Sequence, residues 1–232
     1  MVYFFVNEAL PCEVRKALAR YGECVSLPRF EKLPHPVDGH PDMLMAKIGD
    51  VLFIHREYEA GQRILTDLDV PLFLSEKTVG NAYPDDVALN CFSAAGCLFG
   101  KLSSVSDEVK SYAQREGLAL KNVRQGYAKC SSAVIGGVLV TADRGICAAA
   151  SAEGLETLLV SPWRIGIEVY DTGFIGGASM VLDEQTIGFF GCLASHPEGE
   201  KIRAFFEKNG IEVVELSDGA LFDYGGAVRV VK

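Results

Sequence analysis

The sequence lacks the short patterns that would identify a function directly. Its 232 residues contain no Cys-x-x-Cys pair and no His-Glu-x-x-His, so neither a structural nor a catalytic metal site is predicted. No Gly-Lys-Ser or Gly-Lys-Thr follows a glycine-rich loop, and no Gly-x-Gly-x-x-Gly is present. The common phosphate-binding and dinucleotide-binding loops are therefore absent, and no cofactor is expected.

Positive charge is also scarce. The chain has 22 Lys and Arg residues against 31 Asp and Glu residues, a formal net charge of -9, with no long run of one sign. Binding to a phosphate backbone requires clustered Lys and Arg side chains. The composition therefore argues against a nucleic-acid partner, whereas it leaves a protein partner open.

Long hydrophobic runs are missing too. No stretch approaches the roughly 18 apolar residues that a membrane span needs, so no membrane association is expected. The first residues, MVYFFVNEALP, have no basic segment before their apolar run, which indicates a buried strand rather than a signal peptide. The seven cysteines are odd in number and suggest no disulfide framework. Together these features predict a cytoplasmic protein.

The sequence does contain a repeat. A small or polar residue precedes an apolar strand, a tight turn and a second apolar strand, and this pattern recurs about every 45 residues. The five leading residues are Asp42, Asn90, Ser132, Ser179 and Gly226. Gly and Asp residues at the turns provide the backbone freedom that a hairpin requires. The spacing therefore predicts five supersecondary units.

Each unit continues with a helix, a glycine and a third strand. In the second unit, for example, Ser106 can cap a helix that Gly117 ends. The fifth unit stops after its hairpin, and the missing helix and strand are present near the N-terminus, over residues 14–27. We therefore predict an α/β fold, a single domain over residues 1–232 that forms a closed five-unit ββαβ propeller. A two-domain α/β arrangement is the alternative.

Five such units closed by the two termini resemble the pentein, or guanidino-group-modifying, superfamily. Its fold is shared by deiminases, amidinotransferases, dimethylarginine hydrolases and ribosome anti-association factors. The segments HPDMLM (residues 40–45), GYAKCSSAVIGGVLVTADRGI (126–146) and GFIGGASMVL (173–182) are similar to those of a bacterial branch of that superfamily. The resemblance extends over nearly the whole chain and implies the fold more strongly than any activity.

The chain departs from the catalytic members of the superfamily at the residues that carry their chemistry. The resemblance implies a His followed by a nucleophilic Cys in the last unit, but Val228 and Arg229 stand there. It also implies Gly-His-x-Asp in the fourth unit, where Phe174 and Gly176 replace the His and the Asp. The chain is therefore not expected to act as a typical deiminase.

Polar residues at the unit leaders form the candidate site. In such a ring the first strands surround the axis, so His40 and Asp42 should meet Cys130. A thiol, an imidazole and a carboxylate together can perform nucleophilic catalysis, and a nearby Lys would lower the pKa of the thiol. The alternative is structural: Cys130 as a small buried hydrophobic residue and Asp42 as an acceptor of turn amides.

Further polar residues are candidates for substrate binding. From the leaders these are Asn90, Lys129 and Ser131. Asp143 and Arg144 follow the second strand of the third unit and could bind the charged ends of a substrate. An Asp at a strand end is also a common turn residue, so both interpretations stay open.

Two functions are compatible with these features. The first is a small-molecule hydrolase, or another enzyme that acts on guanidino or amidino compounds, with Cys130 as the nucleophile. The second is a non-catalytic binding module that kept the ring and lost the chemistry. A small molecule at the axis of the ring is a possible ligand, and a protein partner is left open.

Overall fold

Five three-stranded β-sheets form the strand content of the computed structural model, which describes residues 1–232. In each sheet the first two strands are antiparallel, and the third strand is parallel to the second. The strands, unit by unit, are β3 (Met45–Ile48), β4 (Val51–His55) and β5 (Leu72–Ser75); β6 (Phe92–Ala94), β7 (Cys97–Gly100) and β8 (Ala119–Asn122); β9 (Ser132–Ile135), β10 (Val138–Thr141) and β11 (Glu156–Leu159); β12 (Ser179–Val181), β13 (Thr186–Phe189) and β14 (Glu212–Glu215); and β15 (Ala227–Val231), β1 (Val2–Asn7) and β2 (Glu23–Leu27).

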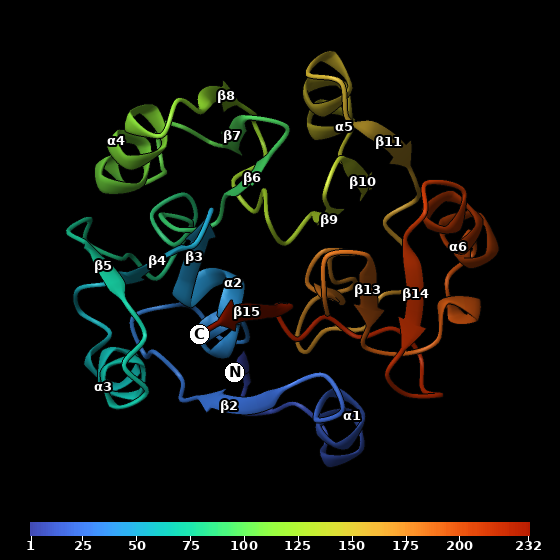
Figure 1. Cartoon of the computed structure of the whole chain (residues 1–232), viewed down its shortest axis with the longest axis horizontal. Coiled ribbons are helices and arrows are strands. Elements are labelled where there is room, and N and C mark those ends of the chain that lie inside the picture. The colour runs from blue at the N-terminus through green and yellow to red at the C-terminus, as the bar shows by residue number, and fades with distance from the viewer.

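One helix joins the second and third strands of each unit, because two parallel strands need a crossover connection. These helices are α3 (Glu59–Asp67), α4 (Asp107–Arg115), α5 (Arg144–Ala152), α6 (Gly199–Lys208) and α1 (Cys12–Leu18). They lie at the periphery in Figure 1, while the first strand of each unit lies toward the centre. Three short segments complete the elements: η1 (Val37–Gly39), α2 (Pro41–Leu44) and η2 (Leu193–Ser195). No helix is both long enough and apolar enough to cross a bilayer.

Local sequence accounts for several helix ends. The Ser106 side chain caps α4 by accepting a hydrogen bond from the Val109 amide at 3.4 Å. The Asp143 carboxylate caps α5 in the same way, accepting from the Ile146 amide at 2.8 Å. Gly117, after α4, has a φ of +76°, a conformation that glycine adopts at little cost. The capping residues visible in the sequence therefore fix these boundaries.

The two ends of the chain share one sheet. β1 pairs antiparallel with β15, with Phe4 opposite Arg229, and pairs parallel with β2 on its other side. The prediction that N-terminal residues complete the fifth unit is thus confirmed. Figure 1 shows the two termini close to each other beside β15.

The five units are arranged around a common centre in Figure 1. Their first strands are neighbours: β15 lies beside β3 and β12, β3 beside β6, and β12 beside β9. The second and third units meet through a hydrophobic cluster that includes Phe92 and Phe99 from one and Leu139 and Ile146 from the other. The segments that precede the first strands consequently converge on the middle of the molecule.

Two predicted elements differ from the structure. The sequence pattern predicts a strand directly after the leader Asp42, but residues 41–44 form the helical turn α2, and β3 begins only at Met45. Pro41 explains the turn, because its fixed φ favours the first position of a helix. The sequence pattern places the helix of the third unit at residues 148–153, but this helix begins at Arg144, since Asp143 caps it.

Candidate functional site

The polar residues that precede the inner strands meet in the centre of the molecule. His40 and Asp42 belong to the start of α2, Asn90 precedes β6, and Cys130 precedes β9. Asp223, which precedes β15, joins them. All five are buried, with exposed fractions of 0–3%. The sequence predicted four of these residues and missed Asp223.

Asn90 links three of the units. Its Nδ2 donates to the backbone oxygen of Asp42 at 3.0 Å and to Cys130 Sγ at 2.9 Å. Its Oδ1 accepts from the backbone amides of Lys129 at 2.7 Å and Cys130 at 3.3 Å. Every polar atom of this side chain is therefore used inside the protein, so Asn90 positions its neighbours rather than facing a ligand.

The Asp42 carboxyl group is buried, and no amide, hydroxyl or charged side chain of the protein donates a hydrogen bond to either oxygen; the Cys130 thiol lies beside it. Burial raises its pKa from the ordinary 3.8 to about 6, while nearby His40 and Lys129 act in the opposite direction. The predicted alternative, in which Asp42 accepts turn amides, is therefore wrong. A carboxyl group of this kind can change protonation state close to neutral pH.

The Cys130 thiol is held in its protonated form. Burial and the carboxyl groups of Asp42 and Asp223 raise its pKa well above the ordinary value, against the opposing effect of the Asn90 hydrogen bond. The expectation that a nearby Lys lowers this pKa is wrong for Lys129, which does not offset burial. A protonated, buried thiol is a poor nucleophile.

His40 and Asp223 form the other half of the cluster. His40 Nδ1 lies 3.7 Å from Asp223 Oδ1, too far for a good hydrogen bond, and that nitrogen has no other partner. The Asp223 carboxylate accepts from the backbone amides of Phe174 at 2.8 Å and Gly225 at 2.9 Å. Asp223 thus ties the fourth unit to the fifth.

The glycine-rich segment after residue 172 encloses that carboxylate. A Cβ atom on Gly177 would lie 1.9 Å from Asp223 Oδ1, and one on Gly173 would lie 2.5 Å from Asp223 Cβ. A side chain cannot fit at either position. The glycines of this motif therefore allow close packing around Asp223, a contact that exists only in the folded chain and that the sequence pattern does not show.

A cavity of about 280 Å³ opens between the first strands of the units. Asp42 and Lys129 line it, together with Lys47 from β3 and Arg229 from β15; the rest of its wall is mostly apolar. Cys130 and His40 do not line this cavity. The residues predicted to form one site therefore do not all reach the cavity. Asp42 and Lys129 line it, whereas Cys130 does not.

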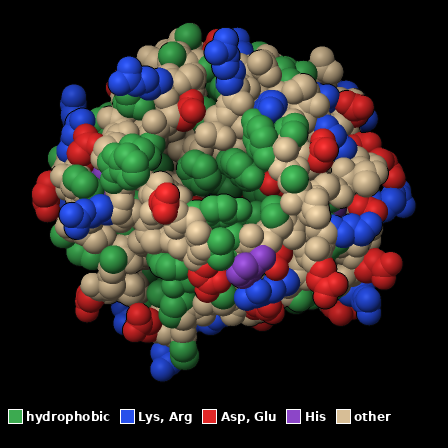
Figure 2. All heavy atoms as spheres, turned by 180° about the vertical axis from the view of Figure 1, so that it is seen from behind, with side chains coloured by type: hydrophobic (Ala, Val, Ile, Leu, Met, Phe, Trp, Pro, Cys, Tyr) green, Lys and Arg blue, Asp and Glu red, His purple; other side chains and the backbone are tan.

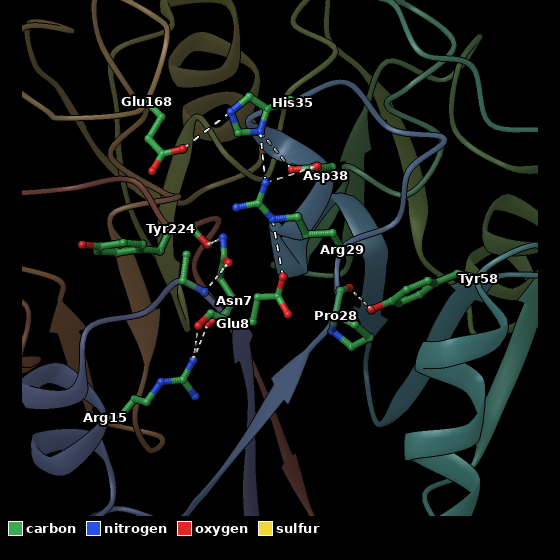
Figure 3. Close-up of polar contacts among 11 residues, drawn as sticks. Asn7, Glu8, Arg15, Pro28, Arg29, His35, Asp38, Tyr58, Glu168 and Tyr224 are labelled. Carbon is green, nitrogen blue, oxygen red and sulfur yellow. Dashed lines mark hydrogen bonds and ion pairs between the residues drawn. The ribbon is translucent and has the colours of Figure 1, made fainter.

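A second, much smaller cavity of about 20 Å³ lies beside His40 and Asp223. Charged residues next to it pair with one another, as Figure 3 shows. Arg29 contacts Glu8 at 3.4 Å and Asp38 at 3.9 Å, and His35 contacts Asp38 and Glu168, each at 3.6 Å. Little space and no free charge remain here for a ligand.

The remaining predicted residues lie apart from the cluster's buried side chains. Ser131 and Asp143 line a separate cavity of about 150 Å³, in which the Ser131 hydroxyl is buried without a hydrogen-bond partner. Asp143 is occupied as the cap of α5, and Arg144 is exposed in the first turn of that helix. The structure does not join Asp143 and Arg144 to Asp42 and Lys129 around one cavity.

The molecular surface is hollowed near the middle of the face opposite to that seen in Figure 1, as Figure 2 shows. Hydrophobic side chains gather in this hollow, and charged side chains of both signs lie around it. No group of three or more His, Cys, Asp or Glu side chains is arranged to hold a metal ion.

Comparison with known proteins identifies the fold. A family model described as "Family of unknown function (DUF6873)" matches residues 5–228. No curated protein sequence matches the chain. Among solved structures, the chain is similar to DDAH from Pseudomonas aeruginosa complexed with citrulline, with a TM-score of 0.54, 10% identity and 98% of each chain covered.

Two amidinotransferases are similar as well. SxtG from Microseira wollei, of the saxitoxin biosynthetic pathway, has a TM-score of 0.56 and 11% identity over 92% of this chain and 87% of its own. The inosamine-phosphate amidinotransferase StrB1 from Streptomyces griseus has a TM-score of 0.54 and 12% identity over 92% of this chain and 75% of its own. The fold is that of the pentein superfamily, and at such low identity the likeness extends to the fold alone.

Proposed function

The chain belongs to the DUF6873 family, whose function is unknown, and from this premise we propose that it is a non-catalytic binding protein that holds a small molecule in its axial cavity. Pentein folds place polar groups at a central axis whether or not they catalyse a reaction. The proposal therefore depends on the side chains found there, and fold similarity by itself does not identify the activity.

One observation carries the proposal: the candidate nucleophile is inaccessible. Cys130 is 2% exposed, does not line the axial cavity, and has a pKa raised well above its ordinary value. Nucleophilic catalysis requires a thiolate that a substrate can reach. The cavity itself, by contrast, is large enough for a small molecule and is lined by charged side chains from different units.

The proposal includes the finer description of the fold: a single domain over residues 1–232, closed as a five-unit ββαβ propeller. The pairing of β1 with β15 and the contacts between neighbouring first strands support it. Closure is relevant to binding because a ring of packed units holds cavity-lining residues from distant parts of the chain in fixed positions.

A hydrolase is the second candidate. It is favoured by the contact between Asp42 and Cys130 and by the pKa of about 6 for Asp42, a value suited to proton transfer near neutral pH. For this function, Cys130, His40 and Asp42 would act together once a conformational change exposed the thiol. The two candidates differ in the reactivity of Cys130.

Alkylation by iodoacetamide, followed by peptide mass spectrometry, separates these candidates. Cys12 is exposed in the same folded chain and serves as an internal control. We expect Cys12 to react and Cys130 to react at least about 100-fold more slowly at pH 8, because its thiol is buried and protonated. Modification of Cys130 at a rate like that of Cys12, with an apparent pKa near or below 8.5, would favour the hydrolase.

A panel of guanidino compounds provides the matching activity test. Arginine, agmatine and methylated arginines at millimolar concentration should release no citrulline, ammonia or methylamine. The superfamily's usual chemistry would need a His and a Cys where the sequence comparison places Val228 and Arg229. Turnover above about 1 s⁻¹ would contradict the binding proposal. Loss of that turnover in Cys130→Ala, but not in Cys12→Ala, would assign it to Cys130.

A further inference from the structure

Three positive charges in the protein have no partner although they are not exposed. Nine Lys and Arg side chains are half-buried: Arg15, Lys47, Lys77, Lys101, Lys110, Lys121, Lys129, Arg203 and Arg229. Six of these donate hydrogen bonds or form ion pairs within the chain. Lys47, Lys129 and Arg229 make no ion pair, and their side chains donate no hydrogen bond.

All three unpaired cations line the 280 Å³ axial cavity. Lys47 comes from β3 and Arg229 from β15, two strands that lie beside each other near the centre of Figure 1. Lys129 comes from the segment before β9. Three units thus contribute positive charge to the wall of one cavity, while every other Lys or Arg without a partner is exposed.

Lys47 and Arg229 are held there at a cost in stability. Burial lowers the pKa of Lys47, and the nearby Arg229 lowers it further, against the favourable effect of Asp50. The Arg229 Nε is buried and donates to nothing. Unsatisfied donors and neighbouring like charges both destabilise a folded chain. A bound anion removes both penalties at once.

We propose that the axial cavity binds a small organic anion, whose carboxylate or phosphate group contacts Lys47, Lys129 and Arg229. Arginine presents several donors in one plane and suits both of these groups. The apolar wall, which includes Met45, Val134 and Met180, accommodates a short hydrocarbon part of the ligand. This inference rests on the proposed binding function and specifies the class of ligand.

Asp42 is the single carboxyl group on the cavity wall. His40, Lys129, Asp223 and Cys130 surround it, and no amide, hydroxyl or charged side chain donates a hydrogen bond to its oxygens. Because both oxygens are buried, Asp42 acts on the ligand through its charge: in its protonated form it is neutral, and in its ionised form it would repel an anion. Anion binding should therefore weaken as the pH rises from 5 to 8, and Asp42→Asn should remove most of that dependence.

Calorimetric titration at fixed ionic strength tests the charge of the ligand. The probes are two matched pairs, succinate with succinamide and benzoate with benzamide, together with glycerol 3-phosphate and inorganic phosphate. We expect at least one organic anion to bind tenfold or more tightly than its amide or than inorganic phosphate. Comparison of glycerol 3-phosphate with succinate and benzoate identifies whether a phosphate or a carboxylate group is preferred. Equal binding of acids and amides would overturn the anion assignment while leaving the binding function intact.

Substitution of the cations gives an independent measurement. Lys47→Gln and Arg229→Gln should each weaken the binding of the selected anion at least tenfold, while Arg124→Gln, at an exposed position without a partner, should not change it. Because the charges destabilise the free protein, Lys47→Gln should also raise its Tm by about 2–4 °C. Unchanged anion binding in the Lys47→Gln and Arg229→Gln double variant, or a lower Tm for Lys47→Gln, would overturn the inference.

Discussion

Asn90 contacts Cys130 at two points: its Nδ2 donates to the Sγ at 2.9 Å, and its Oδ1 accepts from the Cys130 backbone amide at 3.3 Å. The same Nδ2 also contacts the backbone oxygen of Asp42. These three residues come from three different units. One fully buried amide therefore sets the relative positions of the thiol and the carboxyl group that define the candidate site.

Replacement of this amide should destabilise the protein strongly. Asn90→Ala leaves the backbone amides of Lys129 and Cys130 and the Asp42 carbonyl without their partner. We expect a loss of about 2–4 kcal/mol in the free energy of unfolding, measured by urea denaturation. Asn81→Ala, at an exposed position, is the control and should change stability by less than about 0.5 kcal/mol. Similar values for both variants would contradict the role of Asn90.

The buried carboxyl group of Asp42 should make stability fall as the pH rises. Its pKa of about 6 in the folded protein lies above the ordinary 3.8, so the folded state binds more protons than the unfolded state between these values. The stabilisation is complete below about pH 4 and is lost as the pH passes through 6. A shift of about 2 units corresponds to roughly 3 kcal/mol.

Urea denaturation at pH 4 and pH 8 measures this contribution as a difference between variants. The stability of the unsubstituted protein relative to Asp42→Asn should fall by up to about 3 kcal/mol between the two pH values. The exposed Asp67 provides the control, and Asp67→Asn should show no comparable change. This comparison removes the effect of the other carboxylates, several of which have lowered pKa values and the opposite pH dependence. A difference independent of pH would contradict the raised pKa of Asp42.

Two glycines provide a matched pair for the packing around Asp223. A Cβ on Gly177 would overlap the Asp223 carboxylate, while one on Gly137 would meet nothing within 4 Å. Gly177→Ala should lower the free energy of unfolding by about 3 kcal/mol, and Gly137→Ala by less than about 0.5 kcal/mol. If Gly177→Ala is insoluble while Gly137→Ala is not, the soluble fraction on expression gives the same answer. Equal stability of the two variants would show that the contact is not a tight one.

Removal of residues 1–30 should prevent folding. The deletion takes away β1, α1 and β2, which hold fully buried side chains such as Phe4, Phe5 and Leu18, and leaves β15 without a partner. We expect an insoluble or molten product by circular dichroism and gel filtration, whereas a chain lacking only Lys232 should fold. A monomer that begins near Leu33 and unfolds cooperatively would contradict the closed arrangement.

The repeat in the sequence was sufficient to predict the fold because its residues have specific backbone roles. Each unit has a polar or small residue before the first strand, a glycine in the turn, a residue that caps the helix and a glycine that ends it. Ser106 and Gly117, for example, act as the sequence suggests. The convergence of His40, Asp42, Asn90 and Cys130 followed from the same periodicity. The reactivity of the Cys130 thiol could not be predicted from this periodicity. Its pKa depends on burial and on nearby carboxyl groups such as that of Asp223, which approaches the thiol only in the folded state.

Asp143, Lys47 and Arg229 have properties that the sequence pattern could not predict. The sequence left two interpretations of Asp143 open, a substrate-binding residue and a turn residue. In the structure its carboxylate accepts a hydrogen bond from the Ile146 amide, which identifies it as a helix cap. Lys47 lies at an ordinary strand position, and Arg229 stands where the resemblance implies a Cys; nothing in the sequence shows that neither side chain forms an ion pair. That property depends on all the neighbours that surround a side chain in space.

The pairing of β1 with β15 also imposes an order on folding. During synthesis β1 is made first and β15 last, so the apolar strand from Val2 to Asn7 has one unpaired edge until almost the whole chain has been made. An exposed, hydrophobic strand edge is prone to pair with other chains. The nascent protein is thus most vulnerable to aggregation before its last strand emerges, and sequence-distant pairing of this kind slows the final step of folding.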